Sequence, residues 1–354
     1  KAFFDAMQDD VVINIKSGKL HPNDQKKIYD LVIEANKKLF LPYEYEWIYD
    51  SGIKLVGIKQ YTPINFVPEM YENALMSSYY SESSPKFESL KNGSAVKVFL
   101  DLSNSLVVEQ NVDGVYIESE KIFDLNRPSE SFEKLIFKIV DSSLAFPQSS
   151  VLVKLADMSE GMGKVRGALR LIHQKSLFEP ISDAISFARH KKGLTNIHIV
   201  IPFIRGVSEI AQLKRELAVK KLVRRKSLQI WMEVCLPENI VNLEEYLMVG
   251  IDGIVLNLDE LASYFLGYDQ SQEDLIYYKK EVNGLLKFLE DALKILHKSK
   301  VKFIAKGSLT LYPQVLEYLV EKGVFGIVFE KYEAHSAKDL LHQTEKRVVL
   351  KRAS

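Results

Sequence analysis

Beyond residue 94 the chain alternates short apolar runs with amphipathic stretches, which is the pattern of repeated strand and helix units. The runs are apolar at almost every position, as parallel strands buried on both faces are. Eight of them predict strands, at Ala95–Leu102, Gly114–Glu118, Val151–Ala156, Ile197–Phe203, Leu228–Val234, Gly253–Leu258, Val301–Ala305 and Gly326–Glu330. Eight such units in about 240 residues predict an α/β fold, a closed (β/α)8 TIM barrel, because an open doubly wound sheet usually has fewer strands.

The amphipathic stretches between these runs predict the helices of the barrel. They cover Glu130–Leu144, Leu177–Lys191, Val207–Lys220, Leu243–Val249, Glu273–Lys298 and Tyr312–Lys322. We assign residues 93–335 to the barrel and residues 336–354 to a C-terminal tail.

Residues 1–64 follow a different pattern. A strand at Val11–Ile15 precedes a helix from about Pro22 to Leu39, whose start is marked by polar residues after the proline. Two further strands, Tyr45–Tyr49 and Lys54–Gln60, flank a short turn. So few elements bury too little apolar area to fold alone, so we predict a small α+β segment that ends a larger domain.

The next residues, 65–92, are rich in Ser and Glu and show no sustained period, which predicts a linker. The chain begins at Lys1 rather than at a methionine. We therefore expect it to be a piece of a longer protein.

Composition limits the classes of partner. Lys plus Arg and Asp plus Glu both number 47, so no net charge favours nucleic acid or an anionic membrane. No apolar run reaches the roughly 18 residues of a membrane span. Cys235 is the only cysteine, which excludes an internal disulfide, argues against a zinc site based on cysteines, and fits a reducing compartment. We expect a cytoplasmic protein that binds neither nucleic acid nor membrane.

Polar side chains gather where the predicted strands end, which is where barrel enzymes carry their active sites. They are Asp101, Ser103, Glu118, Ser119, Lys154, Asp157, Arg205, Glu233, Cys235, Asn257, Asp259, Glu260 and Lys306. Cations facing carboxylates in one mouth suit a magnesium ion and a phosphorylated small acid. The alternative is that these residues only finish strands and cap helices.

Arg166 and Arg170 lie four residues apart at the start of a predicted helix, a spacing that predicts two guanidinium groups along one face. Guanidinium groups bind carboxylate or phosphate through two parallel hydrogen bonds. Ordinary surface ion pairing is the alternative for this pair.

Four segments of this region resemble motifs of the phosphoenolpyruvate (PEP) synthase and pyruvate phosphate dikinase family. Val165–Arg170 resembles WRGxxR, Ile199–Glu209 resembles MIPFVRTVEE, Asp252–Leu261 resembles DGFSIGSNDL, and Tyr312–Val324 resembles YPEFAEFLVEEGI. The segments occur in the family's order. The chain thus resembles a divergent member whose barrel binds PEP or pyruvate.

The N-terminal segment resembles the same family. Tyr45–Tyr49 and Gly57–Pro63 are similar to the end of its ATP-grasp nucleotide-binding domain. Glu46 and Gln60 match residues that the family places around ATP, whereas Thr62 stands where the family has an arginine. The resemblance implies ATP binding only together with the missing N-terminal part.

In that family ATP phosphorylates a histidine on a mobile middle domain, and the phosphohistidine exchanges its phosphoryl group with pyruvate bound to Mg²⁺ in the barrel. The resemblance implies Mg²⁺ ligands, substrate-binding residues and a homodimer formed through the barrel. The implied residues are Glu233 and Glu260 for the metal, and Arg166, Arg170, Arg205, Lys154 and Asp157 for the substrate.

This sequence departs from the family in its phosphoryl carrier. None of its seven histidines has the family's Ser-His-Ala setting, and the stretch from Pro63 to Ala95 is too short for the middle domain. The phosphohistidine would have to come from another part of the protein or from a separate chain.

The barrel departs too. Ser119 and Lys154 stand at two family arginines, and Cys235 stands at a Mg²⁺-binding glutamate, for which Glu233 on the same strand face is a substitute. The family's proton-donating cysteine becomes Ala305 or, with a one-residue gap, Lys306, which is then the candidate catalytic residue.

Three hypotheses remain. The chain is part of a PEP synthase-like phosphotransferase, or its barrel is an inactive scaffold for anion binding or assembly, or Lys306 forms a Schiff base in an aldolase or lyase. The missing carrier and the altered arginine and cysteine positions favour an inactive binding barrel for this chain by itself.

Overall fold

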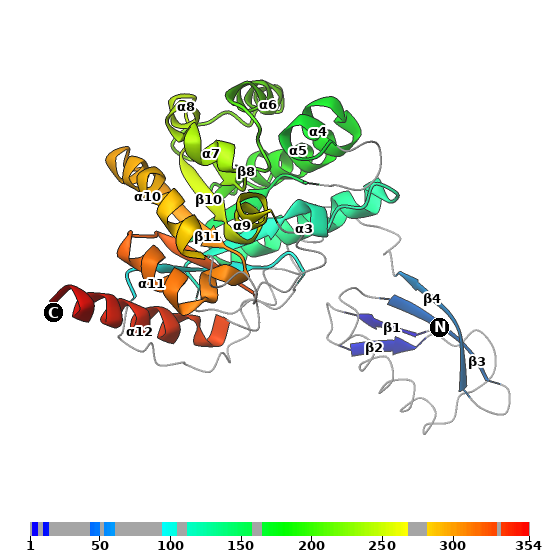
Figure 1. Ribbon diagram of the computed structural model, residues 1–354. Coiled ribbons are helices and arrows are strands. Elements are labelled where there is room, and N and C mark those ends of the chain that lie inside the picture. Colours follow the sequence, from blue (N-terminus) through cyan, green and yellow to red (C-terminus); the bar gives the residue numbers. More distant parts are fainter. Residues whose placement is uncertain are drawn as a thin grey trace. The chain divides into compact units, whose positions relative to one another are not determined.

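The computed structural model describes residues 94–104, 112–157, 165–267, 282–330 and 334–353, together with four strands nearer the N-terminus (Figure 1). The chain divides into two compact units, Lys1–Ser89 and Leu90–Ser354. None of the helices in the described ranges is both long enough and apolar enough to cross a membrane.

The first unit contains a four-stranded sheet with the order β2-β1-β3-β4. Its strands are β1 (Ala2–Asp5), β2 (Asp10–Ile13), β3 (Tyr43–Tyr49) and β4 (Ile53–Gln60), and each neighbouring pair is antiparallel. The hairpin β3–β4 confirms the predicted strand pair, while β1 was not predicted. The predicted helix after Pro22 and the predicted linker lie outside the described residues.

The second unit is a closed barrel of eight parallel strands, which confirms the predicted fold class. The strands are β5 (Lys97–Asp101), β6 (Gly114–Glu118), β7 (Ser150–Lys154), β8 (Ile197–Ile201), β9 (Ile230–Val234), β10 (Gly253–Asn257), β11 (Lys302–Lys306) and β12 (Gly326–Phe329). All eight lie within or next to the predicted runs. Several runs are longer than their strands, because apolar loop residues extend them.

Helices surround the strands (Figure 1). They are α3 (Pro128–Ala145), α4 (Gly167–His173), α5 (Lys175–His190), α6 (Val207–Val219), α7 (Pro237–Val241), α8 (Leu243–Met248), α9 (Leu258–Leu266), α10 (Val282–Lys298), α11 (Pro313–Glu321) and α12 (Ala334–Ala353). Prediction missed α7, α9 and α12. The first two are short, and α12 has too weak an apolar face to show a clear period.

Helix α12 is tied to the barrel. Glu345 Oε1 accepts hydrogen bonds from the Val96 amide at 2.9 Å and from the Ser94 hydroxyl at 2.8 Å, and Lys351 pairs with Glu317 of α11. The residues predicted as a C-terminal tail therefore form a packed helix over their described length.

Apolar side chains fill the interior of the barrel, one from each strand. These eight residues, called the apolar layer here, are Phe99, Tyr116, Leu152, Val200, Trp231, Val255, Ile304 and Val328. The alternate positions of the strands face outward and pack against the helices in a larger cluster. The interior is thus a packed core rather than a pore.

Glycines make room for the largest members of the apolar layer. A Cβ on Gly253 would lie 2.4 Å from the Trp231 ring, and a Cβ on Gly114 would lie 2.3 Å from the Phe99 ring. Two aromatic rings thereby fit inside a narrow barrel, because the neighbouring strands carry no side chain at those points.

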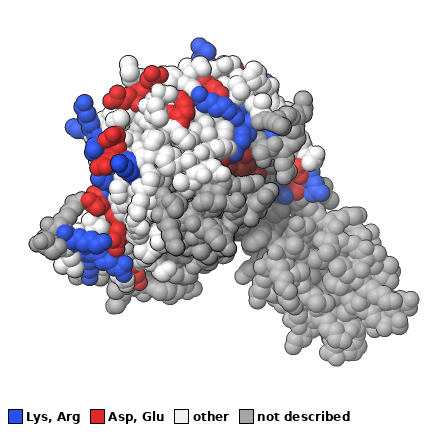
Figure 2. Space-filling model, viewed as in Figure 1, with Lys and Arg blue, Asp and Glu red and all other residues white. Residues whose placement is uncertain are grey.

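On the outer surface, Figure 2 shows Lys and Arg mixed with Asp and Glu on this face, in keeping with the zero net charge.

Candidate functional site at the barrel mouth

Six polar side chains stand at the carboxyl ends of the barrel strands. This mouth layer consists of Asp101 (β5), Glu118 (β6), Lys154 (β7), Glu233 (β9), Asn257 (β10) and Lys306 (β11). Each follows a residue of the apolar layer by two positions, so it lies on the same interior face of its strand. The strand ends meet at one end of the barrel, and the mouth layer covers the apolar layer there.

Lys154 and Lys306 are paired with glutamates. The Lys154 ammonium lies 2.5 Å from Glu120 Oε1, 3.4 Å from Glu118 Oε1 and 3.5 Å from Glu233 Oε2. Lys306 pairs with Glu118 and lies 3.9 Å from Glu233 Oε1. An ion-paired Lys306 presents no unpaired amine to a carbonyl carbon, so the geometry gives the Schiff-base hypothesis no support.

Burial and charge act against each other in this network. Burial opposes the charged form of Glu118, but Lys154 and Lys306 outweigh it and hold the pKa of that carboxyl well below its usual range. At Glu120 burial prevails and raises the pKa to about 7, although Lys154 lowers it. Burial, then the charge of Glu233, raises the pKa of Tyr116 beneath them.

Arg166 forms the other half of the mouth. Its Nε and Nη2 donate to Asp157 at 3.0 and 2.5 Å, and its Nη1 lies 2.6 Å from Glu260 Oε1. Burial opposes the charge of Arg166, but its hydrogen bonds to Asp157 and the negative charges of Asp157 and Glu260 raise the pKa of Arg166 above its usual range. The paired bonds to Asp157 fix the plane of the guanidinium group.

A strained loop brings Arg205 next to Arg166. Phe203 has a φ of 39°, which is uncommon for a residue with a side chain, and Gly167 has a φ of 67°. A Cβ on Gly167 would lie 2.4 Å from the Phe203 carbonyl oxygen, so only glycine fits this contact. Strain of this kind gathers at functional sites, where the surrounding structure supports it.

The two guanidinium groups meet at one aromatic ring. Their central carbons lie 4.1 Å (Arg166) and 4.7 Å (Arg205) from the centroid of the Phe203 ring, and Arg205 Nη1 donates to the Arg166 carbonyl oxygen at 3.0 Å. Cations are attracted to the face of an aromatic ring, which here offsets part of the repulsion between like charges. The structure therefore brings together Arg166, Arg205 and Glu260.

Arg166 and Arg170 do not share a helical face as predicted, and a substrate-binding role for Arg170 stays a prediction. Helix α4 begins at Gly167, and Arg166 precedes it with an extended backbone, so the spacing of residues on a helix does not apply. Arg170 is buried in α4, where its Nε donates to Gln174 at 2.8 Å. Glu46 and Gln60 lie in β3 and β4, and their side chains lie outside the described residues.

Glu233, Cys235 and Glu260 form a group of possible metal ligands. One donor atom from each lies within 4.8 Å of the others. Asn257 holds the two carboxylates, because its Nδ2 donates to Glu233 Oε1 at 3.1 Å and to Glu260 Oε2 at 3.2 Å. Burial and the charge of Glu233 raise the pKa of Glu260 to about 7, against the effect of Arg166.

The donor set fits Mg²⁺ only in part. The predicted ligands Glu233 and Glu260 do lie together, and carboxylate oxygens suit this ion. The buried Cys235 thiol beside them does not, because Mg²⁺ demands oxygen ligands in near-octahedral geometry.

Sequence reasoning missed part of this site. Glu118 was noted only as a strand-end residue, although its position two residues after the buried Tyr116 signals an interior carboxylate. Glu120 and Lys121 gave no such signal, because they lie in the short 3₁₀ helix Ser119–Lys121, where the strand alternation no longer applies.

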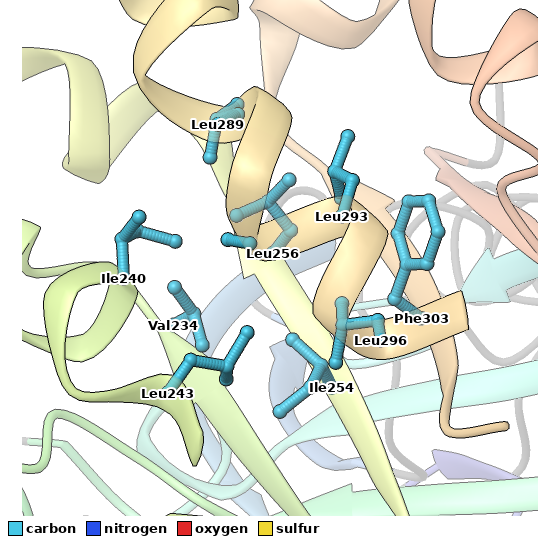
Figure 3. Close-up of a pocket in the computed structure, with 10 residues that line it drawn as sticks. Val234, Ile240, Leu243, Ile254, Leu256, Leu289, Leu293, Leu296 and Phe303 are labelled. Carbon is cyan, nitrogen blue, oxygen red and sulfur yellow. The ribbon is translucent and has the colours of Figure 1, made fainter. Parts of the chain in front are cut away.

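A separate apolar cavity lies between the strands and α10 (Figure 3). Its lining is entirely aliphatic and aromatic and includes Val234, Leu256, Leu293 and Phe303. Because no polar group points into it, it is a packing gap rather than a candidate for chemistry.

Known proteins are similar in sequence to the barrel that carries this mouth. The family model for the PEP-binding domain of PEP-utilising enzymes matches residues 152–346. Phosphoenolpyruvate synthase of Helicobacter pylori is 29% identical over 168 residues, which cover 46% of this chain and 20% of that protein. Phosphoenolpyruvate synthase of Pseudomonas aeruginosa is 28% identical over 215 residues, which cover 54% of this chain and 27% of that protein.

Among solved structures, the chain is similar to Haloferax volcanii malate synthase in a pyruvate/acetyl-CoA ternary complex, with a TM-score of 0.50, 12% identity, and coverage of 71% of this chain and 69% of that chain. At this identity the likeness concerns the fold alone. The chain spans about a quarter of the length of the curated relatives that it matches. Since the family model matches more than half of the chain, the protein belongs to the PEP-utilising enzyme family and carries that family's PEP-binding domain.

Proposed function

We propose that the mouth of this barrel binds a small carboxylate of the PEP or pyruvate type through Arg166 and Arg205. The observation that carries the proposal is the meeting of these two guanidinium groups on Phe203 at the end of the barrel where the strands finish. Their side chains are 26% and 34% exposed, so a ligand can reach both from solvent.

The same proposal extends to the whole protein. We infer that the barrel serves as the PEP-binding part of a PEP synthase-like protein, with ATP-binding and phosphohistidine parts elsewhere in that protein or in another chain. The relatives named phosphoenolpyruvate synthase support this. Homodimer formation and a cytoplasmic location stay predictions.

A second candidate, a binding or assembly barrel without phosphoryl transfer, rests on a different observation. Lys154 and Lys306 are already neutralised by Glu118, Glu120 and Glu233. A phosphate entering between these glutamates would meet carboxylates rather than free cations, which costs binding energy. On the arginine side Arg166 also pairs with two carboxylates, Asp157 and Glu260, but the side chains of Arg166 and Arg205 are 26% and 34% exposed and can meet an anion from solvent.

Isothermal titration calorimetry with oxalate and with PEP, with and without Mg²⁺, tests the proposal. We expect both anions to bind, and Arg166→Ala to lose at least tenfold in affinity, since a charge-assisted hydrogen bond is worth about 1.5–3 kcal/mol. Arg224→Ala is the matched control, because Arg224 also forms a paired salt bridge, to Asp252, but outside the mouth.

Two outcomes separate the candidates. Binding of oxalate without PEP favours the assembly or binding barrel, because only the phosphate is then rejected. Failure of both anions to bind under all conditions rejects a carboxylate site at this mouth.

A further inference from the structure

The Glu233, Cys235 and Glu260 cluster carries an inference about the metal. We propose that this mouth selects a thiophilic divalent ion such as Zn²⁺ or Co²⁺ over Mg²⁺, with Cys235 as a thiolate ligand between two carboxylates. The inference deepens the proposed function by naming the ion that would lie beside the bound carboxylate.

The geometry of the three donors supports a single ion. Their candidate ligand atoms all lie within 4.8 Å of one another, a spacing that small movements toward one ion would close to bonding distance. Glu233 and Cys235 are two residues apart and lie on the same interior face of β9 and the residue that follows it. Glu260 comes from the first turn of α9. Three protein donors leave a coordination position open for a ligand, as at catalytic zinc sites.

A second observation points to a missing cation. Glu233 is fully buried, and its Oε2 atom accepts no hydrogen bond from the part of the chain that the structure describes. The nearest positive charge, the Lys154 ammonium, lies 3.5 Å away and is shared with Glu118 and Glu120. A buried carboxylate oxygen without a hydrogen bond is costly, and a metal ion would satisfy it.

The balance of charges at the mouth also favours a bound cation. The ion pairs of the mouth form two groups: Lys121, Lys154 and Lys306 with Asp101, Glu118, Glu120 and Glu233, and Arg166 with Asp157 and Glu260. Carboxylates outnumber cations among these ion pairs, and a bound cation would reduce this imbalance. Buried charges are ordinarily paired or bound to metal.

The Cys235 thiol determines which metal ion the cluster prefers. Thiolate ligands favour zinc and other soft or borderline ions, whereas carboxylate and water favour Mg²⁺. The chain has a single cysteine, so any metal–thiolate signal must come from Cys235. Cobalt is a suitable probe, because a thiolate bound to Co²⁺ absorbs in the near ultraviolet.

The test is a Co²⁺ titration of the whole chain, followed by absorbance and repeated in a large excess of Mg²⁺. We expect a thiolate-to-cobalt band that Mg²⁺ does not remove and that Zn²⁺ abolishes. Cys235→Ser should remove the band and weaken Zn²⁺ binding by more than the roughly 10- to 100-fold that loss of a supporting hydrogen bond costs. Glu260→Gln, which keeps the cysteine, should weaken both metals without abolishing the band at saturation.

Absence of the band at saturating Co²⁺, or Zn²⁺ binding no weaker in Cys235→Ser than in the unmodified chain, overturns the inference. Circular dichroism of each variant shows whether the barrel has folded. The oxalate titration with Arg166→Ala separates this inference from the proposed function: metal binding without oxalate binding rejects only the carboxylate site, and oxalate binding without a thiolate band rejects only the metal site.

Discussion

The apolar layer and the mouth layer lie two residues apart on the same strands, and yet they differ in nearly every property. The apolar layer is filled by eight hydrophobic side chains, with Gly114 and Gly253 making room for two aromatic rings. The mouth layer gathers buried charges whose partners come from other strands and loops. The comparison separates two roles: the apolar layer stabilises the barrel, whereas the mouth layer holds charges at a cost that a ligand or metal would offset.

Breaking the ion pairs of the mouth gives the largest expected effect on stability. Lys154→Met should lower the free energy of unfolding by about 3–5 kcal/mol, because it leaves buried glutamates without their shared cation. Urea denaturation measures the change. Lys121→Met is the control: Lys121 also pairs with Glu118 but is 35% exposed, so its loss should cost about 1 kcal/mol or less. Equal effects in the two variants would show that burial of the network is not what makes it important.

A pH effect in the barrel interior comes next. Burial and then the charge of Arg189 lower the pKa of His198 to about 4, against about 6.5 in an unfolded chain. The unfolded state binds more protons between these values. The stability from a neutral His198 is therefore complete above pH 6.5 or so and is lost as the pH falls toward 4, by up to about 3 kcal/mol.

The comparison of the protein with His198→Gln by urea denaturation at pH 7 and pH 4.5 checks this. Other groups titrate in both proteins, so the difference between the two isolates the histidine. If the variant loses as much stability on acidification as the unmodified chain, His198 is not the source.

The apolar layer is tested by filling the space of one glycine. Gly253→Ala should destabilise the barrel by about 1–3 kcal/mol, since the new Cβ would lie 2.4 Å from the Trp231 ring. Gly284→Ala is the matched control in α10, where the nearest atom, on Phe265, lies 3.8 Å away. There the substitution should stabilise by up to about 1 kcal/mol. Thermal denaturation distinguishes the two, and a neutral Gly253→Ala would contradict the close packing of the layer.

The smallest expected effect on stability comes from Arg205→Ala. Arg205 is part-exposed, and its ion pair with Glu209 is 3.8 Å long, so its removal should cost less than about 1 kcal/mol. Oxalate affinity should nevertheless fall about tenfold, as expected for loss of a charge-assisted hydrogen bond. If Arg205→Ala lowers the free energy of unfolding but leaves oxalate affinity unchanged, Arg205 stabilises the fold and does not bind the ligand.

The fold was predictable because each strand carries its own signal. Runs such as Ile197–Phe203 are apolar throughout and are separated by amphipathic helices, so the strands can be located without knowledge of their neighbours. The site depends on contacts between different strands. That Glu118 would share Lys154 and Lys306 follows from the register of β6 against β7 and from the closure of the barrel, which no local pattern contains.

Local backbone geometry explains why Arg166 and Arg170 do not share the predicted helical face. The spacing of Arg166 and Arg170 suggested one helical face, but the positive φ of Gly167 ends the extended segment and starts α4 one residue later. The sequence motif shows which residues are present, and the turn decides that Arg166 faces Asp157 and Glu260.

A crystal structure of the chain grown with oxalate tests the central claim most directly. We predict density for the anion at the barrel mouth, with its carboxylate hydrogen-bonded to Arg166 and within reach of Arg205. A mouth in which Arg166 keeps its pairs with Asp157 and Glu260 and no anion is bound, in crystals grown at saturating oxalate, would contradict the account.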